Sequence, residues 1–152
     1  MTGTQPKRAP MWKRWWARWC FLRATFYRHW GNLGSGRVEY ERAVDFFTRA
    51  VESDPLFVNA YYQRGVLYWR EIQNYYRAIR DFAHVLELDP HRTLALYMRA
   101  LAYQSRCDYD DAIADYERFL SVDGDPTWSE SARIQLDGVR ELRDARNARR
   151  AR

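Results

Sequence analysis

The chain has 152 residues, enough for one domain with a modest core, and its 47% hydrophobic, 30% charged and 16% aromatic composition excludes a disordered protein. The net charge of +5 hides an asymmetry: residues 1–37 hold eight basic and no acidic residues, whereas residues 38–139 hold eleven basic and eighteen acidic ones. Two cysteines without metal-ligand spacing indicate reduced thiols in the cytoplasm, and regularly spaced basic residues up to Arg28 argue against a signal peptide or a membrane span.

The first predicted element is an amphipathic helix over Met11–Trp30, which holds five of the seven tryptophans. With the basic tail before it, it forms an N-terminal region that we place at residues 1–23. At 100° per residue the aromatic side chains lie on one side and the basic ones on the other, and only Phe21 and Arg23 depart from this division. The predicted docking residues are Trp12, Trp15, Trp16, Trp19, Leu22 and Phe26, with Arg14 and Arg18 on the basic side.

A tryptophan face opposite a cationic face is typical of a helix that lies in a membrane interface, where indole sits at headgroup depth and arginine meets lipid phosphate. We therefore predict that this helix docks on an anionic membrane surface or on a membrane-protein complex. Two alternatives stay open: the aromatic residues cover the first unit of the following domain, or they insert between subunits of a larger assembly. Nucleic acid is disfavoured because the body of the chain is acidic and carries no nucleic-acid motif.

Three similar stretches follow: "ERAVDFFTRAVESDP" from Glu41, "YRAIRDFAHVLELDP" from Tyr76 and "DDAIADYERFLSVDG" from Asp110. Each places an alanine, an aromatic residue four positions later and an apolar residue three further on, which is one stripe of a helix. These stripes are Ala43, Phe47 and Ala50; Ala78, Phe82 and Val85; and Ala112, Tyr116 and Phe119. A second helical segment precedes each stretch and carries a small residue where two helices must approach closely, at Gly31, Gly65 and Ala100.

This pattern resembles the tetratricopeptide repeat (TPR) family. The resemblance implies an all-α fold in which three helix-turn-helix repeats form a short right-handed solenoid. We place the repeats at residues 24–57, 58–92 and 93–126. The first departs from the family pattern by its "GSG" at Gly34–Gly36, the second by one extra residue, and the third by Gly124 in place of the terminal proline.

The last predicted element is a capping helix followed by a basic tail, over residues 127–152. Its apolar face would cover the last repeat, which otherwise leaves apolar surface in water. The residues of this face are Trp128, Ala132, Leu136, Val139 and Leu142. We expect the arginine-rich tail beyond Asp144 to be solvated and partly disordered.

The resemblance also implies a binding site, because the first helices of TPR units line a concave groove that receives a peptide or a partner helix. Carried over by position, the partner-groove residues are Arg28, Asn32, Asn59, Tyr62, Gln63, Val66, Trp69, Leu94, Tyr97, Met98 and Leu101. Some TPR co-chaperones hold a C-terminal carboxylate in a clamp of two lysines, two asparagines and one arginine. Leu94 and Met98 stand where that clamp needs cations, so an apolar or aromatic-binding groove is the better prediction. In the alternative, Trp69 and Tyr97 pack between repeats.

No residue pattern predicts chemistry. His29, His84 and His91 lack metal-ligand spacing, the glycines of "GNLGSG" lack the dinucleotide-binding arrangement, and "DYDDAIADYE" lacks the glycine of a calcium loop. We therefore predict no catalytic residues, cofactor, metal, small-molecule substrate or nucleic acid.

Our main functional prediction is a non-enzymatic TPR scaffold for protein–protein interactions. It would be cytoplasmic and peripheral, held on the cytoplasmic face of a membrane or on a membrane complex by its N-terminal helix. The alternative is a soluble TPR adaptor or assembly factor that binds a partner segment in its groove. The sequence does not identify the partner or the membrane, and it does not distinguish a permanent subunit from a transient factor.

Overall fold

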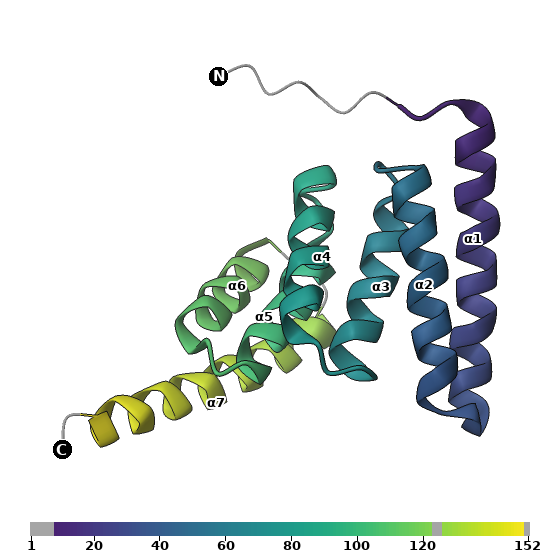
Figure 1. Cartoon of the computed structure of the whole chain (residues 1–152). Helices are drawn as coiled ribbons and strands as arrows, with labels where there is room; N and C mark the ends of the chain where they lie inside the picture. The colour runs from purple at the N-terminus through teal and green to yellow at the C-terminus, as the bar shows by residue number, and fades with distance from the viewer. Residues whose placement is uncertain (1–7, 123–125, 151–152) are drawn as a thin grey trace.

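The computed structural model describes residues 8–122 and 126–150, and this part of the chain contains helices and no strand. The helices are α1 (Met11–Trp30), α2 (Arg37–Ser53), α3 (Val58–Arg70), α4 (Tyr75–Leu88), α5 (Thr93–Ser105), α6 (Tyr109–Val122) and α7 (Pro126–Arg150). They form three antiparallel pairs, α1–α2, α3–α4 and α5–α6, stacked in chain order with α7 packed on α6 (Figure 1). The predicted all-α solenoid with a helix at each end is confirmed. The predicted boundary after residue 23 falls inside α1, which is one continuous helix.

The repeated stripes form the core. All nine alanine, aromatic and apolar positions of the three stripes are fully buried. The buried residues divide into two clusters, one centred on α1 to α4 and one on α5 to α7. Leu86, Met98 and Tyr103 pack against both clusters, so the stack is continuous from the second pair into the third.

Small residues allow the two helices of a pair to cross closely. A Cβ atom added at Gly65 would lie 2.9 Å from Cε1 of Phe82, and one added at Gly31 would lie 2.7 Å from Cε1 of Tyr40. The equivalent Ala100 of the third pair is fully buried. The prediction that helices approach closely is confirmed at Gly31 and Gly65, and the burial of Ala100 agrees with it.

The first pair has a turn of its own. After α1 the chain turns over Gly31–Ser35, where Gly34 breaks the helix with φ of 111°, and Gly36 follows with φ of 78°. L-amino acids with a side chain adopt such angles at a cost, so both positions favour glycine. This turn is the "GSG" departure from the family pattern, and it lets α2 begin at Arg37.

Buried ion pairs recur in the second and third pairs. Arg64 donates two hydrogen bonds to Asp81, at 2.8 and 2.7 Å, and Arg99 donates two to Asp115, both at 2.7 Å. These side chains are between 6 and 18% exposed. The hydrogen bonds with Asp115 raise the pKa of the Arg99 guanidinium, although burial opposes the charged form.

The first pair differs at the same positions. When Gly31 is aligned with Gly65, Trp30 occupies the repeat position of Arg64. When Phe47 is aligned with Phe82, Phe46 occupies the repeat position of Asp81. The first pair therefore has two aromatic residues where the others have an ion pair.

The C-terminal helix is longer than predicted. The arginine-rich segment beyond Asp144 is helical through Arg150, so the expectation of a partly disordered tail is wrong for residues 145–150. The physical reason is a tertiary contact: Arg146 donates a hydrogen bond of 2.7 Å to the carbonyl of Cys107, and its guanidinium lies 4.7 Å from the ring centre of Tyr109. Ala132, Leu136 and Val139 are buried as predicted, whereas Trp128 and Leu142 stay partly exposed at the edges.

Candidate functional site

The first candidate site is the surface of the predicted groove residues on α1, α3 and α5, which we call the inner face. Two hydrogen bonds join neighbouring helices along it. Arg28 of α1 donates to Oε1 of Gln63 on α3 at 2.5 Å, and Nε1 of Trp69 on α3 donates to Oγ of Ser105 on α5 at 3.2 Å. The fold therefore brings predicted groove residues from separate repeats onto one surface.

Arg28 is the cation at one end of the inner face. Burial lowers the pKa of its guanidinium, and the positive charge of Arg70 lowers it further. Within the described residues no carboxylate lies at ion-pair distance from Arg28. The neighbouring Asn32 is already engaged, since its Oδ1 accepts a hydrogen bond of 2.9 Å from the hydroxyl of Tyr40. Arg28 is thus a half-buried cation whose charge is unbalanced by any described carboxylate.

A second cation on this face was not among the predicted residues. Arg92 precedes α5, donates to Oδ1 of Asn59 at 2.5 Å and stacks 4.7 Å above the ring of Tyr62. Burial raises the pKa of the Tyr62 hydroxyl, and the charge of Arg92 partly offsets that shift. In the described part of the chain Arg92 likewise has no carboxylate at ion-pair distance. Arg92 could have been found from the sequence, because it stands in the turn between two repeats, directly before the first helix of the third repeat.

The rest of the inner face is apolar. Val66, Trp69, Met98, Leu94 and Leu101 are half-buried, because each packs against the core with one side. Their other sides stay accessible.

Tyr97 does not belong to the accessible part of the inner face. It is 7% exposed, and its ring lies 5.8 Å from that of Tyr116, 5.6 Å from Phe119 and 5.3 Å from Trp128. We correct its assignment: Tyr97 is a packing residue that joins α5 to α6 of its own pair and to α7, whereas the alternative prediction was packing between repeats.

The second candidate site is on α1. Trp12, Trp15, Trp16, Trp19, Leu22, Phe26 and Trp30 are between 44 and 68% exposed, and we call this surface the aromatic face. Arg14 and Arg18 are also exposed. The aromatic and aliphatic docking residues therefore share one accessible side of the helix, and the two arginines are accessible as well.

The opposite side of α1 explains why the tryptophans stay outside. Ala17, Cys20 and Ala24 are fully buried against α2. Small side chains let α1 approach α2 closely, and Trp12, Trp15 and Trp16 stay 47 to 68% exposed. The ring of Trp19 lies 6.0 Å from that of Phe46 on α2, so the capping alternative applies in part to Trp19. The two exceptions to the amphipathic division also find partners: Phe21 packs 5.4 Å from Phe47, and Arg23 lies 5.4 Å from the ring of Trp19.

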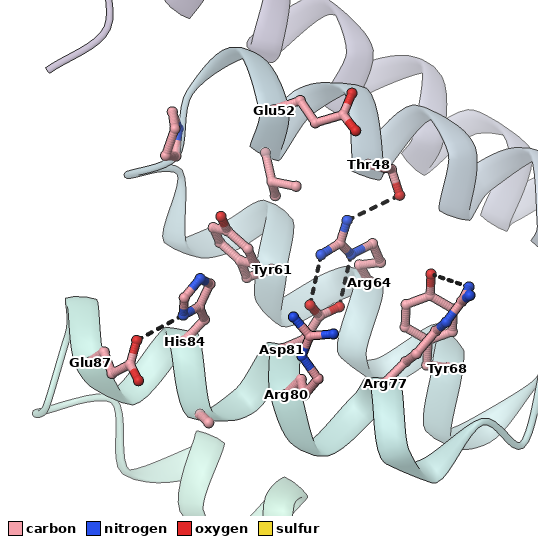
Figure 2. A pocket seen from close by; sticks show the side chains of 13 residues that line it. Thr48, Glu52, Tyr61, Arg64, Tyr68, Arg77, Arg80, Asp81, His84 and Glu87 are labelled. Atoms are coloured by element: carbon pink, nitrogen blue, oxygen red, sulfur yellow. Dashed lines mark hydrogen bonds and ion pairs between the residues drawn. The ribbon is translucent and has the colours of Figure 1, made fainter. Parts of the chain in front are cut away.

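The third candidate site is a hollow between α2, α3 and α4 (Figure 2). It has a volume of about 750 Å³ and contains the Arg64–Asp81 pair. Figure 2 shows that several of its polar side chains bond to one another: Arg64 also donates to Thr48, Arg77 to Tyr68, and His84 pairs with Glu87. Most of the arginine, aspartate and histidine side chains named here are therefore engaged with other parts of the stack.

Among residues 8–122 and 126–150, no group of three or more His, Cys, Asp or Glu side chains could hold a metal ion. Within the same residues, none of the helices combines the length and the apolar character that a membrane crossing requires.

A stack of antiparallel helix pairs with small residues at each crossing defines a helical-repeat solenoid. Residues 58–92 and residues 93–126 each match a family model described as "Tetratricopeptide repeat". The chain is a tetratricopeptide repeat protein.

Curated relatives share the repeats with this chain. A serine/threonine-protein phosphatase T of Aspergillus oryzae is 35% identical over 97 residues, covering 62% of this chain and 20% of the phosphatase. Heat shock protein STI1 of Saccharomyces cerevisiae is 23% identical over 127 residues, covering 84% of this chain and 21% of STI1. Since the chain spans about a fifth of the length of each, the activities of these whole proteins do not transfer to it.

Solved structures show the same fold. The first TPR of Spaghetti (RPAP3), bound to the HSP90 peptide SRMEEVD, superposes with a TM-score of 0.73 at 20% identity and covers 90% of this chain and 98% of that one. MamA superposes with a TM-score of 0.72 at 21% identity and covers 86% of this chain and 70% of that one. At these identities the likeness concerns the fold alone.

Proposed function

We propose that this chain is an adaptor domain that binds an acidic segment of a partner protein on its inner face. The observation that carries the proposal is the pair of cations, Arg28 and Arg92, that no described carboxylate balances. Most of the other inner-face positions are apolar. A segment with carboxylates beside an apolar side chain would complement both parts.

The relatives support this kind of ligand. The Spaghetti domain is bound to SRMEEVD, a peptide with two glutamates and one aspartate. In this chain only part of the carboxylate clamp is present, because Leu94 and Met98 replace two of its cations. We therefore propose an acidic segment in general, with Arg92 supplying the second positive charge, and no strict requirement for a terminal carboxylate.

The test uses the peptide SRMEEVD and a twin in which Gln, Gln and Asn replace Glu, Glu and Asp. Fluorescence anisotropy should show at least tenfold tighter binding of the acidic peptide at low salt, because hydrogen bonds to charged groups contribute about 1.5–3 kcal/mol each. Changing the terminal carboxylate of SRMEEVD to an amide should weaken binding less than neutralising its side chains does.

The matched variants separate the inner face from general charge. Arg28→Ala and Arg92→Ala should each weaken SRMEEVD at least fivefold, whereas Arg80→Ala, which removes an exposed cation on α4, should have little effect. Equal binding of the two peptides, or equal effects of all three variants, would refute the proposal.

The membrane docking predicted from the N-terminal helix has weaker support. The aromatic face is exposed, which lipid binding and protein binding both require, and the Spaghetti structure above contains a bound peptide. The adaptor function therefore does not include a membrane, and a membrane is tested below as an alternative occupant of that face. The absence of enzymatic activity and the cytoplasmic location stay predictions.

A further inference from the structure

The aromatic face of α1 is long and continuous. It extends from Trp12 to Trp30, about 27 Å at 1.5 Å per residue, which is the length of five helical turns. Its N-terminal half contains a hollow of about 470 Å³ lined by Trp12, Trp15, Trp16 and Trp19. Exposed apolar surfaces of this kind mark interaction sites in folded proteins.

The register of the repeats shows what covers the same face on the other first helices. Phe26 is equivalent to Ala60 of α3 and Ala95 of α5, and both alanines are fully buried. Ala95 belongs to the core cluster of the preceding pair, α3–α4, instead of the cluster of its own pair. This face of a first helix therefore packs against the pair before it.

The position of the ion-pair arginine also faces the preceding pair. Trp30 is equivalent to Arg64, whose guanidinium donates a hydrogen bond of 3.0 Å to Thr48 on α2, the second helix of the preceding pair. On α3 the face is thus covered by α2, and on α5 by α4. On α1 no described element covers it, and the side chains there are Phe and Trp instead of Ala and Arg.

Charge restricts the occupant. Residues 1–37 hold eight basic and no acidic residues, and the exposed Arg18, four residues before Leu22, borders the aromatic face on one side, with Arg14 one turn before it. On the other side Arg23 lies over the rings of Trp19 and Phe46, at 5.4 and 5.5 Å. A second copy of α1 would bring like charges together, whereas a helix with acidic flanks would meet cations on both sides.

We propose that the aromatic face is the docking site for an amphipathic helix of a partner protein, with an apolar stripe and acidic flanks. This helix would lie on α1 as α2 lies on α3 and α4 on α5. The face is separate from the inner face, so this proposal does not depend on the acidic-segment ligand proposed there.

The test uses the whole chain and two synthetic 18-residue peptides. Both carry leucine along one helical face and alanine elsewhere, and they differ only in glutamate or lysine along the two flanks. Anisotropy of labelled peptide should show at least tenfold tighter binding of the glutamate peptide. Equal binding of the two peptides, or no binding of either, would overturn the proposal.

Variants locate the binding. The double variant Trp15→Ala, Leu22→Ala should weaken the glutamate peptide at least tenfold, because aromatic and aliphatic anchors dominate such interfaces. Ile134→Ala, which removes an equally exposed apolar side chain on α7, should leave binding unchanged, and so should Arg28→Ala on the inner face. Arg14→Glu with Arg18→Glu should reverse the preference in favour of the lysine peptide. Circular dichroism confirms that each variant is folded.

Two other occupants give distinct results. If the chain floats with vesicles of phosphatidylcholine and phosphatidylserine, loses flotation in the Trp15→Ala, Leu22→Ala variant and is not displaced by the glutamate peptide, the occupant is a membrane. If sedimentation equilibrium shows a dimer that this variant dissociates, the occupant is a second copy. Either result would overturn the proposal.

Discussion

The first helix pair and the two pairs that follow it share a backbone pattern but differ where neighbouring pairs meet. In α3 and α5 the face toward the preceding pair carries a buried alanine and an arginine that is paired with an aspartate. In α1 the same face carries Phe26 and Trp30, and Phe46 takes the place of the aspartate. The three pairs therefore share the residues of their internal stripe, but the first pair differs from the other two in the residues of the face toward a preceding pair.

Position in the stack, more than membership of the repeat, therefore decides which residues this face carries. A small residue and an internally neutralised charge suit a surface that another helix of the same chain covers. Large aromatic side chains suit a surface that stays accessible and can bind something else.

The largest expected effect comes from breaking one of the ion pairs. Asp81→Ala would leave Arg64 buried without its carboxylate, and removing one partner of such a pair costs about 3–5 kcal/mol. Urea denaturation should show this loss in the free energy of unfolding. The double variant Arg64→Leu, Asp81→Leu should recover much of it, since it leaves no unpaired charge. A loss below about 1 kcal/mol for Asp81→Ala would show that water reaches Arg64.

The equivalent change in the first pair should cost less. Phe46→Ala removes ring contacts with Tyr27 at 5.4 Å and Trp19 at 6.0 Å, but Phe46 is only partly buried. We expect a loss of about 1–2 kcal/mol in the same denaturation experiment, below the range for a fully buried phenylalanine. A loss as large as that of Asp81→Ala would remove the distinction between the pairs.

The close helix crossings give a third comparison. Gly65→Ala places a methyl group against Phe82, which is fully buried and cannot move aside, whereas Gly31→Ala meets Tyr40, which is partly exposed and can. After the gain in helix propensity, we expect Gly65→Ala to cost about 1 kcal/mol and Gly31→Ala close to nothing. The thermal midpoints of the two variants, each compared with that of the unchanged chain, measure these two costs. The reverse order would mean that the first pair is the more tightly packed one.

The smallest expected effect belongs to the aromatic face. Trp15 is 66% exposed, so Trp15→Ala should change the free energy of unfolding by about 0.5 kcal/mol or less. Chemical denaturation followed by circular dichroism is suitable, because it does not rely on tryptophan fluorescence. A clear destabilisation would show that the tryptophans contribute to folding, which would weaken the docking proposal.

Much of the fold was predictable because it repeats. Alanine, aromatic and apolar residues at constant spacing in three stretches identify the buried stripe, and all of these positions are buried. The C-terminal end was not predictable in the same way. A charged segment such as residues 145–150 has no apolar stripe, and its helix depends on the contact of Arg146 with Cys107, two residues that are distant in sequence.

The candidate site was only partly predictable. Position in the repeat correctly indicated that Arg28 and Gln63 lie together, since both belong to first helices. It failed for Tyr97, because the ring of Trp128 on the added helix α7 covers it. The ion pairs were visible in the sequence as Arg and Asp at equivalent positions of two repeats, but their partners become evident only once α3 lies beside α4.

The matching residues of α3 and α5 have an evolutionary consequence. A duplicated copy of the second pair, inserted between the second and third pairs, would find Ala, Arg and Asp at every new junction, so the gene could lengthen there by internal duplication. An insertion of the same copy before α1 would meet Phe26 and Trp30 instead. Homologues with more repeats should therefore have gained them after the first pair, and their first helix should keep its tryptophans.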